Sequence, residues 1–121
     1  MGDVMQYKVV LLKKQFSQTV QLYPHIVESL YTNPNNQFDI QQLELLFEPL
    51  GDSKEKLLNL LHQREDYTYF HGIHQIINSI TGDKMMIKMN EYDLDVKEND
   101  ENHIIFDMMC SFSQNFYMIK A

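Results

Sequence analysis

Apolar residues recur every three or four positions through the first part of the chain. The series is Met5, Val9, Leu12, Phe16, Val20, Tyr23, Val27 and Leu30. This spacing puts them on one face of a helix, so we predict a long amphipathic helix that begins at Val4. Pro24 should break or kink it near Leu22, because proline lacks a backbone N–H and restricts the residue before it. Alternation from Met5 to Leu11 leaves a short strand as the alternative.

Signals for helix starts precede three further segments. Asp39 can cap a helix over Ile40–Phe47, and Asp52 with Glu55 has the capping-box spacing for a helix that runs to about Glu65. Asp66 can cap another helix, which Gly82 would end. Its buried stripe would be Phe70, Ile73, Ile77 and Ile80. The sequence therefore predicts a helical part over residues 4–81.

The hydrophobic period changes to two after Lys84. Apolar residues alternate at Met85, Ile87 and Met89, at Tyr92, Leu94 and Val96, and at Ile104, Phe106, Met108, Cys110 and Phe112. Alternation of this kind predicts a β meander over residues 84–120. The fold class we expect is α+β, with about four N-terminal helices packed on a C-terminal antiparallel meander of three to four strands.

Length and composition predict one soluble domain over residues 1–121. The chain has 44% hydrophobic residues and one cysteine, Cys110, which cannot form an internal disulfide. There is no positively charged start followed by an apolar run, and the longest apolar runs are far shorter than the roughly 20 residues that span a bilayer. We expect a cytoplasmic protein without a membrane segment.

The net charge of -7 constrains the partners. The chain has seventeen acidic residues and ten Lys and Arg, whereas sequence-independent nucleic-acid binding needs clustered cations. Direct nucleic-acid binding is therefore not favoured. We expect a protein partner with a basic surface.

The acidic charge is densest in residues 91–102, EYDLDVKENDEN. If residues 98–102 form a hairpin loop, Val96 falls opposite Ile104, and Asp93 falls opposite Asp107. Like charges in that position are destabilising, which favours a binding role over a purely structural one. The predicted partner-binding residues are Asp93, Asp95, Glu98, Asp100, Glu101 and Asp107. The simpler interpretation is the solvent-exposed side of an ordinary hairpin.

These features predict a small, non-enzymatic adaptor or inhibitor. An inhibitor that imitates nucleic acid, with carboxylates in place of phosphates, is a specialised form of this hypothesis. A calcium loop is excluded, because a loop that starts at Asp93 has Lys97 at a ligand position and Glu98 where glycine is needed. A weak cation site between Asp93 and Asp107 stays open as an alternative.

An enzymatic alternative rests on four residues, His62, Asp66, His71 and His74. On a helix, His71 and His74 could face one direction and form part of a metal or acid/base cluster. They lack the glutamate of a metalloprotease helix and any nearby cysteine, so a polar helix face explains them better. Cys110 is expected on the core side of a strand. No cofactor is expected, because the four glycines are isolated and form no phosphate-binding loop.

Two further predictions concern assembly and fold. Short helices followed by a hairpin also fit a winged-helix regulator, in which helices at 39–47 and 53–65 would form the turn-linked pair. Acids in the wing would face phosphates, which makes DNA binding unfavourable. The first helix carries extra apolar residues at Val10, Leu11 and Leu22, and this wide arc predicts a homodimer through that helix.

Overall fold

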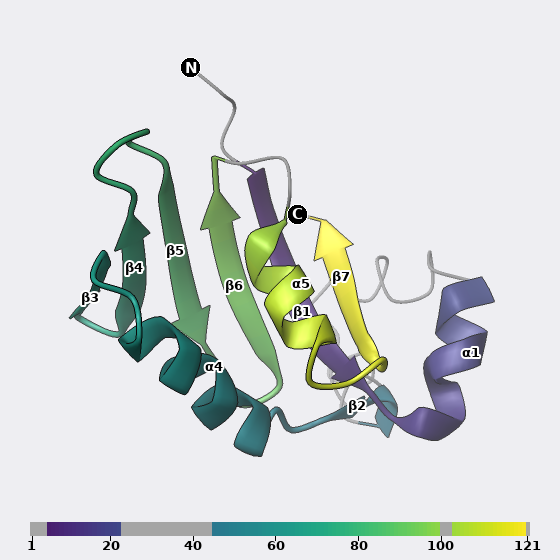
Figure 1. Ribbon diagram of the computed structural model, residues 1–121. Coiled ribbons are helices and arrows are strands. Elements are labelled where there is room, and N and C mark those ends of the chain that lie inside the picture. Colours follow the sequence, from purple (N-terminus) through teal and green to yellow (C-terminus); the bar gives the residue numbers. More distant parts are fainter. Residues whose placement is uncertain (1–4, 23–44, 100–102, 121) are drawn as a thin grey trace.

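The computed structural model describes residues 5–22, 45–99 and 103–120 (Figure 1). In these residues it has three helices and seven strands. The helices are α1 (Lys14–Leu22), α4 (Asp52–His62) and α5 (Ile104–Cys110). The strands are β1 (Met5–Leu12), β2 (Phe47–Glu48), β3 (Tyr67–Phe70), β4 (Ile73–Ile77), β5 (Lys84–Met89), β6 (Asp93–Glu98) and β7 (Phe116–Lys120).

All seven strands belong to one antiparallel sheet. Strands β3, β4, β5 and β6 pair in chain order, and β6 pairs with β1. On its other side β1 pairs with β7. The last two residues of β1 pair with β2, which lies on the same side as β6. The first strand of the chain is therefore central in the sheet, and β3 lies at an edge (Figure 1).

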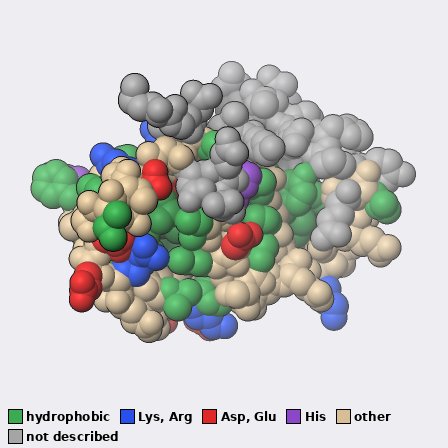
Figure 2. Space-filling view, turned by 45° about the horizontal axis from the view of Figure 1, so that its top comes forward, with side chains coloured by type: hydrophobic (Ala, Val, Ile, Leu, Met, Phe, Trp, Pro, Cys, Tyr) green, Lys and Arg blue, Asp and Glu red, His purple; other side chains and the backbone are tan. Residues whose placement is uncertain are grey.

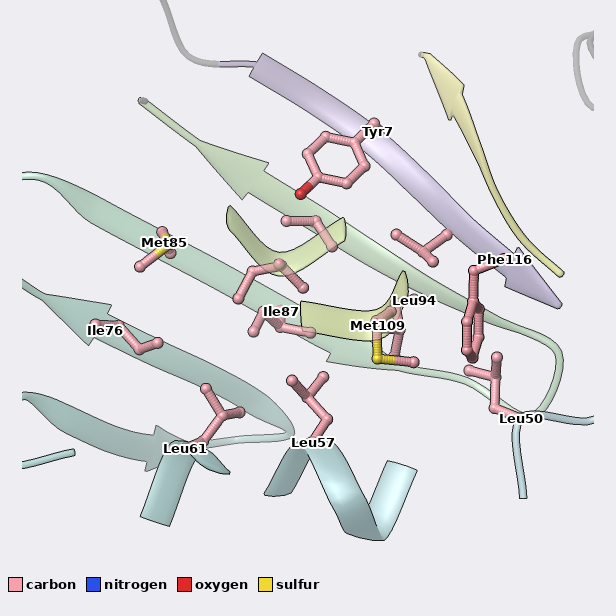
Figure 3. Close-up of a cluster of buried hydrophobic side chains, with 13 residues drawn as sticks. Tyr7, Leu50, Leu57, Leu61, Ile76, Met85, Ile87, Leu94, Met109 and Phe116 are labelled. Carbon is pink, nitrogen blue, oxygen red and sulfur yellow. The ribbon is translucent and has the colours of Figure 1, made fainter. Parts of the chain in front are cut away.

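The main core lies between the sheet and two helices. Leu57 and Leu61 of α4 and Ile105 and Met109 of α5 are completely buried against one sheet face. In Figure 3, Leu57 and Leu61 point toward the strands that carry Ile76 and Ile87. Residues four apart along each helix thus form its buried face, as expected for short amphipathic helices.

A smaller core lies on the opposite face at one end of the sheet. Val20 of α1 packs there with Val10, Leu12, Phe47 and Ile119. Since successive residues of a strand point to opposite faces, β1 supplies Val9 to the main core and Val10 to the smaller one. The strand is buried on both faces over this stretch.

Helix α5 carries the chain from β6 to β7. Both strands are antiparallel to β1, so they run parallel to each other with β1 between them. Parallel strands need a crossover connection, and α5 supplies it on the face that α4 also covers (Figure 1).

The prediction of one long N-terminal helix is wrong. Residues 5–12 form β1, so the alternative strand is confirmed, and of the described residues in this segment Lys14–Leu22 is helical. Pro24, where a break was predicted, and the rest of the stripe lie outside the described residues. The apolar residues that suggested a dimer through this helix are mainly internal, since Val10 is completely buried and Leu11 packs against the main core. The periodicity was misleading because a central strand buried on both faces is apolar at nearly every position.

The predicted helix after Asp66 is also wrong. Residues 67–77 form the β3–β4 hairpin, with His71 and Gly72 as its two-residue turn. Both turn residues have positive φ, 51° and 80°, as type I′ turns require. Phe70 and Ile80 are exposed rather than buried, at 73% and 92%.

The predicted strand after residue 103 is a helix, α5, so the meander does not extend to residue 120. Asp93 consequently lies across from Val10 of β1, and not from Asp107. The alternation in residues 85–89 and 94–96 is real and belongs to the paired strands β5 and β6.

The predicted fold class, about four N-terminal helices on a meander of three to four strands, is therefore wrong, because seven strands form one sheet, the first of them near the N-terminus, and the three described helices are spread along the chain. The helix expected after Asp52 is confirmed as α4. Of the helix expected over 40–47, residues up to 44 lie outside the described residues, Leu45 and Leu46 are helical, and Phe47 belongs to β2. No helix in the described ranges is long and apolar enough to cross a membrane.

Candidate binding face of the sheet

Helices α4 and α5 cover one face of β4, β5, β6 and the start of β1, and no described helix covers the opposite face of these strands. We call this opposite surface the open face. Following the strand register, its side chains are Gln6, Lys8, Ile73, Gln75, Ile77, Lys84, Met86, Lys88, Asp93, Asp95 and Lys97. It lies on the side turned away from the viewer in Figure 1. Four of the nine lysines of the chain are on this face.

The register arranges these side chains in two adjacent rows across the strands. One row runs Ile73, Lys88, Asp95, Lys8, and the next runs Gln75, Met86, Lys97, Gln6. Strands in a sheet are about 4.8 Å apart, so neighbours within a row lie side by side. Asp95 therefore has a lysine on each side in its row and Lys97 two positions along its own strand.

These rows form an open hollow of about 340 Å³. Its lining consists of Gln6, Lys8, Ile73, Met86, Ile87, Lys88, Asp95 and Lys97. Ile73 and Met86, both half-buried, provide apolar surface, whereas Lys88 and Lys97 are exposed. The hollow therefore combines a small apolar floor with cationic side chains.

Lys8 forms ion pairs with both aspartates of β6. Its Nζ lies 2.6 Å from Oδ1 of Asp95 and 3.8 Å from Oδ2 of Asp93. The side-chain amide of Asn90 donates to both carboxylates, at 2.7 Å to Asp93 and 3.1 Å to Asp95. In the described part of the chain, Lys84, Lys88 and Lys97 form no ion pair, and they remain exposed. Four lysines against two aspartates leave a formal charge of +2 here, on a chain of -7.

The predicted partner-binding acids do not form a single surface. Asp93 and Asp95 are both paired with Lys8, Glu98 is completely buried on the α5 side, and Asp107 lies on α5. Asp100 and Glu101 lie outside the described residues. On the face that Figure 2 presents, the Asp and Glu side chains lie apart from one another among hydrophobic and neutral groups.

Glu98 has a structural role at the start of α5. Its Oε1 accepts the N–H of Ile105 at 3.0 Å, and its Oε2 accepts the hydroxyl of Tyr7 at 3.0 Å. The Tyr7 oxygen in turn accepts the N–H of Phe106 at 3.3 Å. Burial, followed by the nearby charge of Glu98, raises the pKa of Tyr7 well above its usual range. The carboxylate thus satisfies one free N–H group at the helix start and the Tyr7 oxygen satisfies a second, at a position where negative charge is also favourable.

Two of the four residues of the enzymatic alternative lie near each other on different elements. His62 ends α4 and His74 lies on β4, and the ring of Tyr67 stands between them, 5.1 Å and 5.9 Å from their centroids. The Tyr67 hydroxyl lies 2.6 Å from Nδ1 of His74. Burial, followed by the proximity of His62, lowers the pKa of His74.

The other two residues do not join this group. His71 is exposed in the hairpin turn against Phe70, and Asp66 forms a two-bond pair with Arg64. The hydrogen bonds from Arg64 lower the pKa of Asp66. Within residues 5–22, 45–99 and 103–120, no three His, Cys, Asp or Glu side chains are placed to hold a metal ion. Cys110, expected in the core, is exposed on α5.

The lysines of the open face were missed because the sequence reading followed the acids. The signal was present in the alternation of the two segments. Lys84, Met86 and Lys88 share one side of β5, and Asp95 and Lys97 share one side of β6. Only the pairing of β1 with β6, distant in sequence, joins Lys8 to this group. No protein-family model and no curated protein matches the chain.

Proposed function

We propose that this chain is a small, non-enzymatic interaction protein that binds an acidic, extended segment of a partner protein on its open face. The observation that carries this proposal is the gathering of Lys8, Lys84, Lys88 and Lys97 on the one side of β4–β6 that no described helix covers. An adaptor or an inhibitor would both use such a surface.

The arrangement of the lysines favours an acidic ligand. Lys88 lies beside Asp95 on the neighbouring strand, and Lys97 lies two positions along the strand of Asp95, which is paired with Lys8. Their two ammonium groups are therefore available to carboxylates, and a local positive field speeds association with them. Met86 and Ile73 offer an apolar floor for the side chains of the bound segment.

The expected affinity is modest and depends on salt. Each exposed ion pair contributes about 0–1 kcal/mol, and salt screens it. The sequence suggested a partner with a basic surface. Such a partner would have to contact acids that lie on different sides of the sheet, such as Asp95 and Asp107. The winged-helix alternative needs a hairpin as its acidic wing, whereas β6 leads into helix α5 in the described residues. The first helix of its turn-linked pair, over 39–47, lies mostly outside the described residues.

A charge-reversal experiment tests the proposal. We would combine Lys88→Glu with Lys97→Glu and compare it with Lys14→Glu combined with Lys56→Glu, which makes the same charge change on exposed residues of α1 and α4. The probe is a fluorescent oligoglutamate peptide at low salt, and amide chemical shifts map its position. Binding should produce shifts in β1, β4, β5 and β6, and it should be lost in the first double variant only.

Two outcomes would count against the proposal. If the peptide shifts no amide of β5 or β6, or if both double variants lose binding equally, the open face is not the site. If single-stranded oligothymidylate binds the same face much more tightly than oligoglutamate, the partner is a nucleic acid and the protein-partner proposal is wrong.

A further inference from the structure

Strand β3 presents unpaired backbone groups along one edge of the sheet. Among the described residues it pairs only with β4. The N–H of Ile77 donates to the carbonyl of Asp66 at 3.2 Å, so Asp66 faces β4. Hydrogen-bonded and non-hydrogen-bonded positions alternate in an antiparallel pair, so Thr68 and Phe70 also face β4. The N–H and C=O groups of Tyr67 and Tyr69 therefore point away from the sheet.

Apart from its shortness, at four residues, this edge lacks the features that usually prevent strand pairing. Charged residues, proline and bulges commonly protect edge strands. The sequence of β3, YTYF, has no charge and no proline, and its register with β4 is unbroken from Tyr67 to Phe70. Tyr69 and Phe70 are 59% and 73% exposed. Aromatic and β-branched residues of this kind also have high strand propensity.

We infer that β3 pairs with β3 of a second copy of this chain, in antiparallel orientation about a two-fold axis at Thr68. Only Tyr67 and Tyr69 offer outward groups, so a symmetric ladder must join Tyr67 to Tyr69 of the partner subunit and the reverse. A ladder centred on Tyr69 would need His71, whose φ of 51° belongs to the turn and not to an extended strand. The register at Thr68 is the one that uses both outward residues of each strand.

The side chains agree with this register. Tyr67 and Tyr69 point to the same side as His74, against which both rings already lie, at 5.9 Å and 4.8 Å between centroids. Pairing would set each Tyr69 beside Tyr67 of the partner subunit and bury part of its exposed ring, and cross-strand aromatic pairs of this kind are stabilising. The bond from Tyr67 to His74 fixes one ring of each pair in advance.

A two-fold axis at Thr68 stands perpendicular to the sheet. The two sheets then continue into one another, and both open faces lie on the same side. This dimer does not depend on the proposed function, because the open face plays no part in the contact.

The test combines self-association with hydrogen exchange. Wild-type protein should dimerise in sedimentation equilibrium as its concentration rises, and the Tyr67 and Tyr69 amides should become protected over the same range. Thr68→Lys places two cations at the axis and should weaken the dimer roughly tenfold or more. Gln18→Lys, which makes the same charge change on exposed α1, should not. Thr68 is exposed, so circular dichroism should show both variants folded.

Three results would overturn the inference. The first is a wild-type protein that stays monomeric up to about millimolar concentration. The second is a dimer that Thr68→Lys and Gln18→Lys weaken equally, since its interface would lie elsewhere. The third is a dimer in which the Tyr67 and Tyr69 amides exchange as fast as in the monomer.

Discussion

The buried hydroxyl of Tyr7 provides a sharp test of how α5 is held on the sheet. Tyr7 is 1% exposed, donates to Glu98 and accepts from the N–H of Phe106. Tyr7→Phe keeps the ring and removes both hydrogen bonds. Glu98 keeps its bond from Ile105, so the change weakens the helix start without removing its cap.

The magnitude follows from the two bonds. A hydrogen bond to a charged group contributes about 1.5–3 kcal/mol, and a buried N–H left without a partner costs at least about 1 kcal/mol. We therefore expect Tyr7→Phe to lower the free energy of unfolding by about 3 kcal/mol, a large part of the roughly 5–15 kcal/mol typical of a domain. In urea unfolding followed by circular dichroism, the midpoint should fall by roughly 1–3 M.

Tyr69→Phe is the matched control, because the Tyr69 side chain is largely exposed and also lies on a strand. Its free energy of unfolding should stay within about 0.5 kcal/mol of wild type. If Tyr7→Phe were as stable as this control, the hydroxyl would contribute nothing net, and the explanation of how α5 is capped would be wrong.

Three further predictions concern pH and the hairpin turn. Burial raises the pKa of Tyr7 above its unfolded value of 10.0, so above pH 10 the unfolded chain releases a proton that the folded protein keeps. Wild type should then lose about 1.4 kcal/mol per pH unit more than Tyr7→Phe, measured by urea unfolding. The pKa of His74 is lowered from 6.5. The contribution of neutral His74 to the free energy of unfolding is therefore complete above pH 6.5 and is lost as the pH falls through the folded pKa. His74→Gln should make the free energy of unfolding depend less on pH below 6.5, and an NMR titration of His74 checks the direction of its pKa shift. In the turn, His71→Asn should stabilise by about 0.5 kcal/mol, and Gly72→Ala, at φ 80°, should destabilise by about 1 kcal/mol, both measured by thermal unfolding.

The parts of the fold that the sequence predicted correctly depend on local signals. Helix α4 follows a leucine stripe, although Gly51 and not Asp52 is its N-cap and no side-chain cap bond forms, and β5 and β6 show simple alternation between a buried and an open face. Each of these elements has one buried side, so its period is readable from its own residues.

The errors fall where local patterns fit two structures. Phe70, Ile73 and Ile77 have helical spacing, yet the residues that face α4 are His74 and Ile76, and a His-Gly turn is a weaker signal than Asn-Gly. Residues 104–110, IIFDMMC, are almost continuously apolar, so alternation and helical period fit equally. The helix is favoured because a crossover is needed to bring β7 to the far side of β1, a requirement that local sequence does not contain.

The candidate binding face shows why net charge is a poor guide to a partner. Acids dominate the composition, but the described acids of residues 91–102 are used in different ways: Asp93 and Asp95 pair with Lys8, and Glu98 caps α5 inside the core. The lysines that remain exposed on one side of the sheet then define the local field. Because salt screens charges beyond about 8–10 Å, a ligand on the open face experiences these lysines more strongly than the distant acids that set the total of -7. The electrostatic preference of the surface can therefore be opposite in sign to that of the chain.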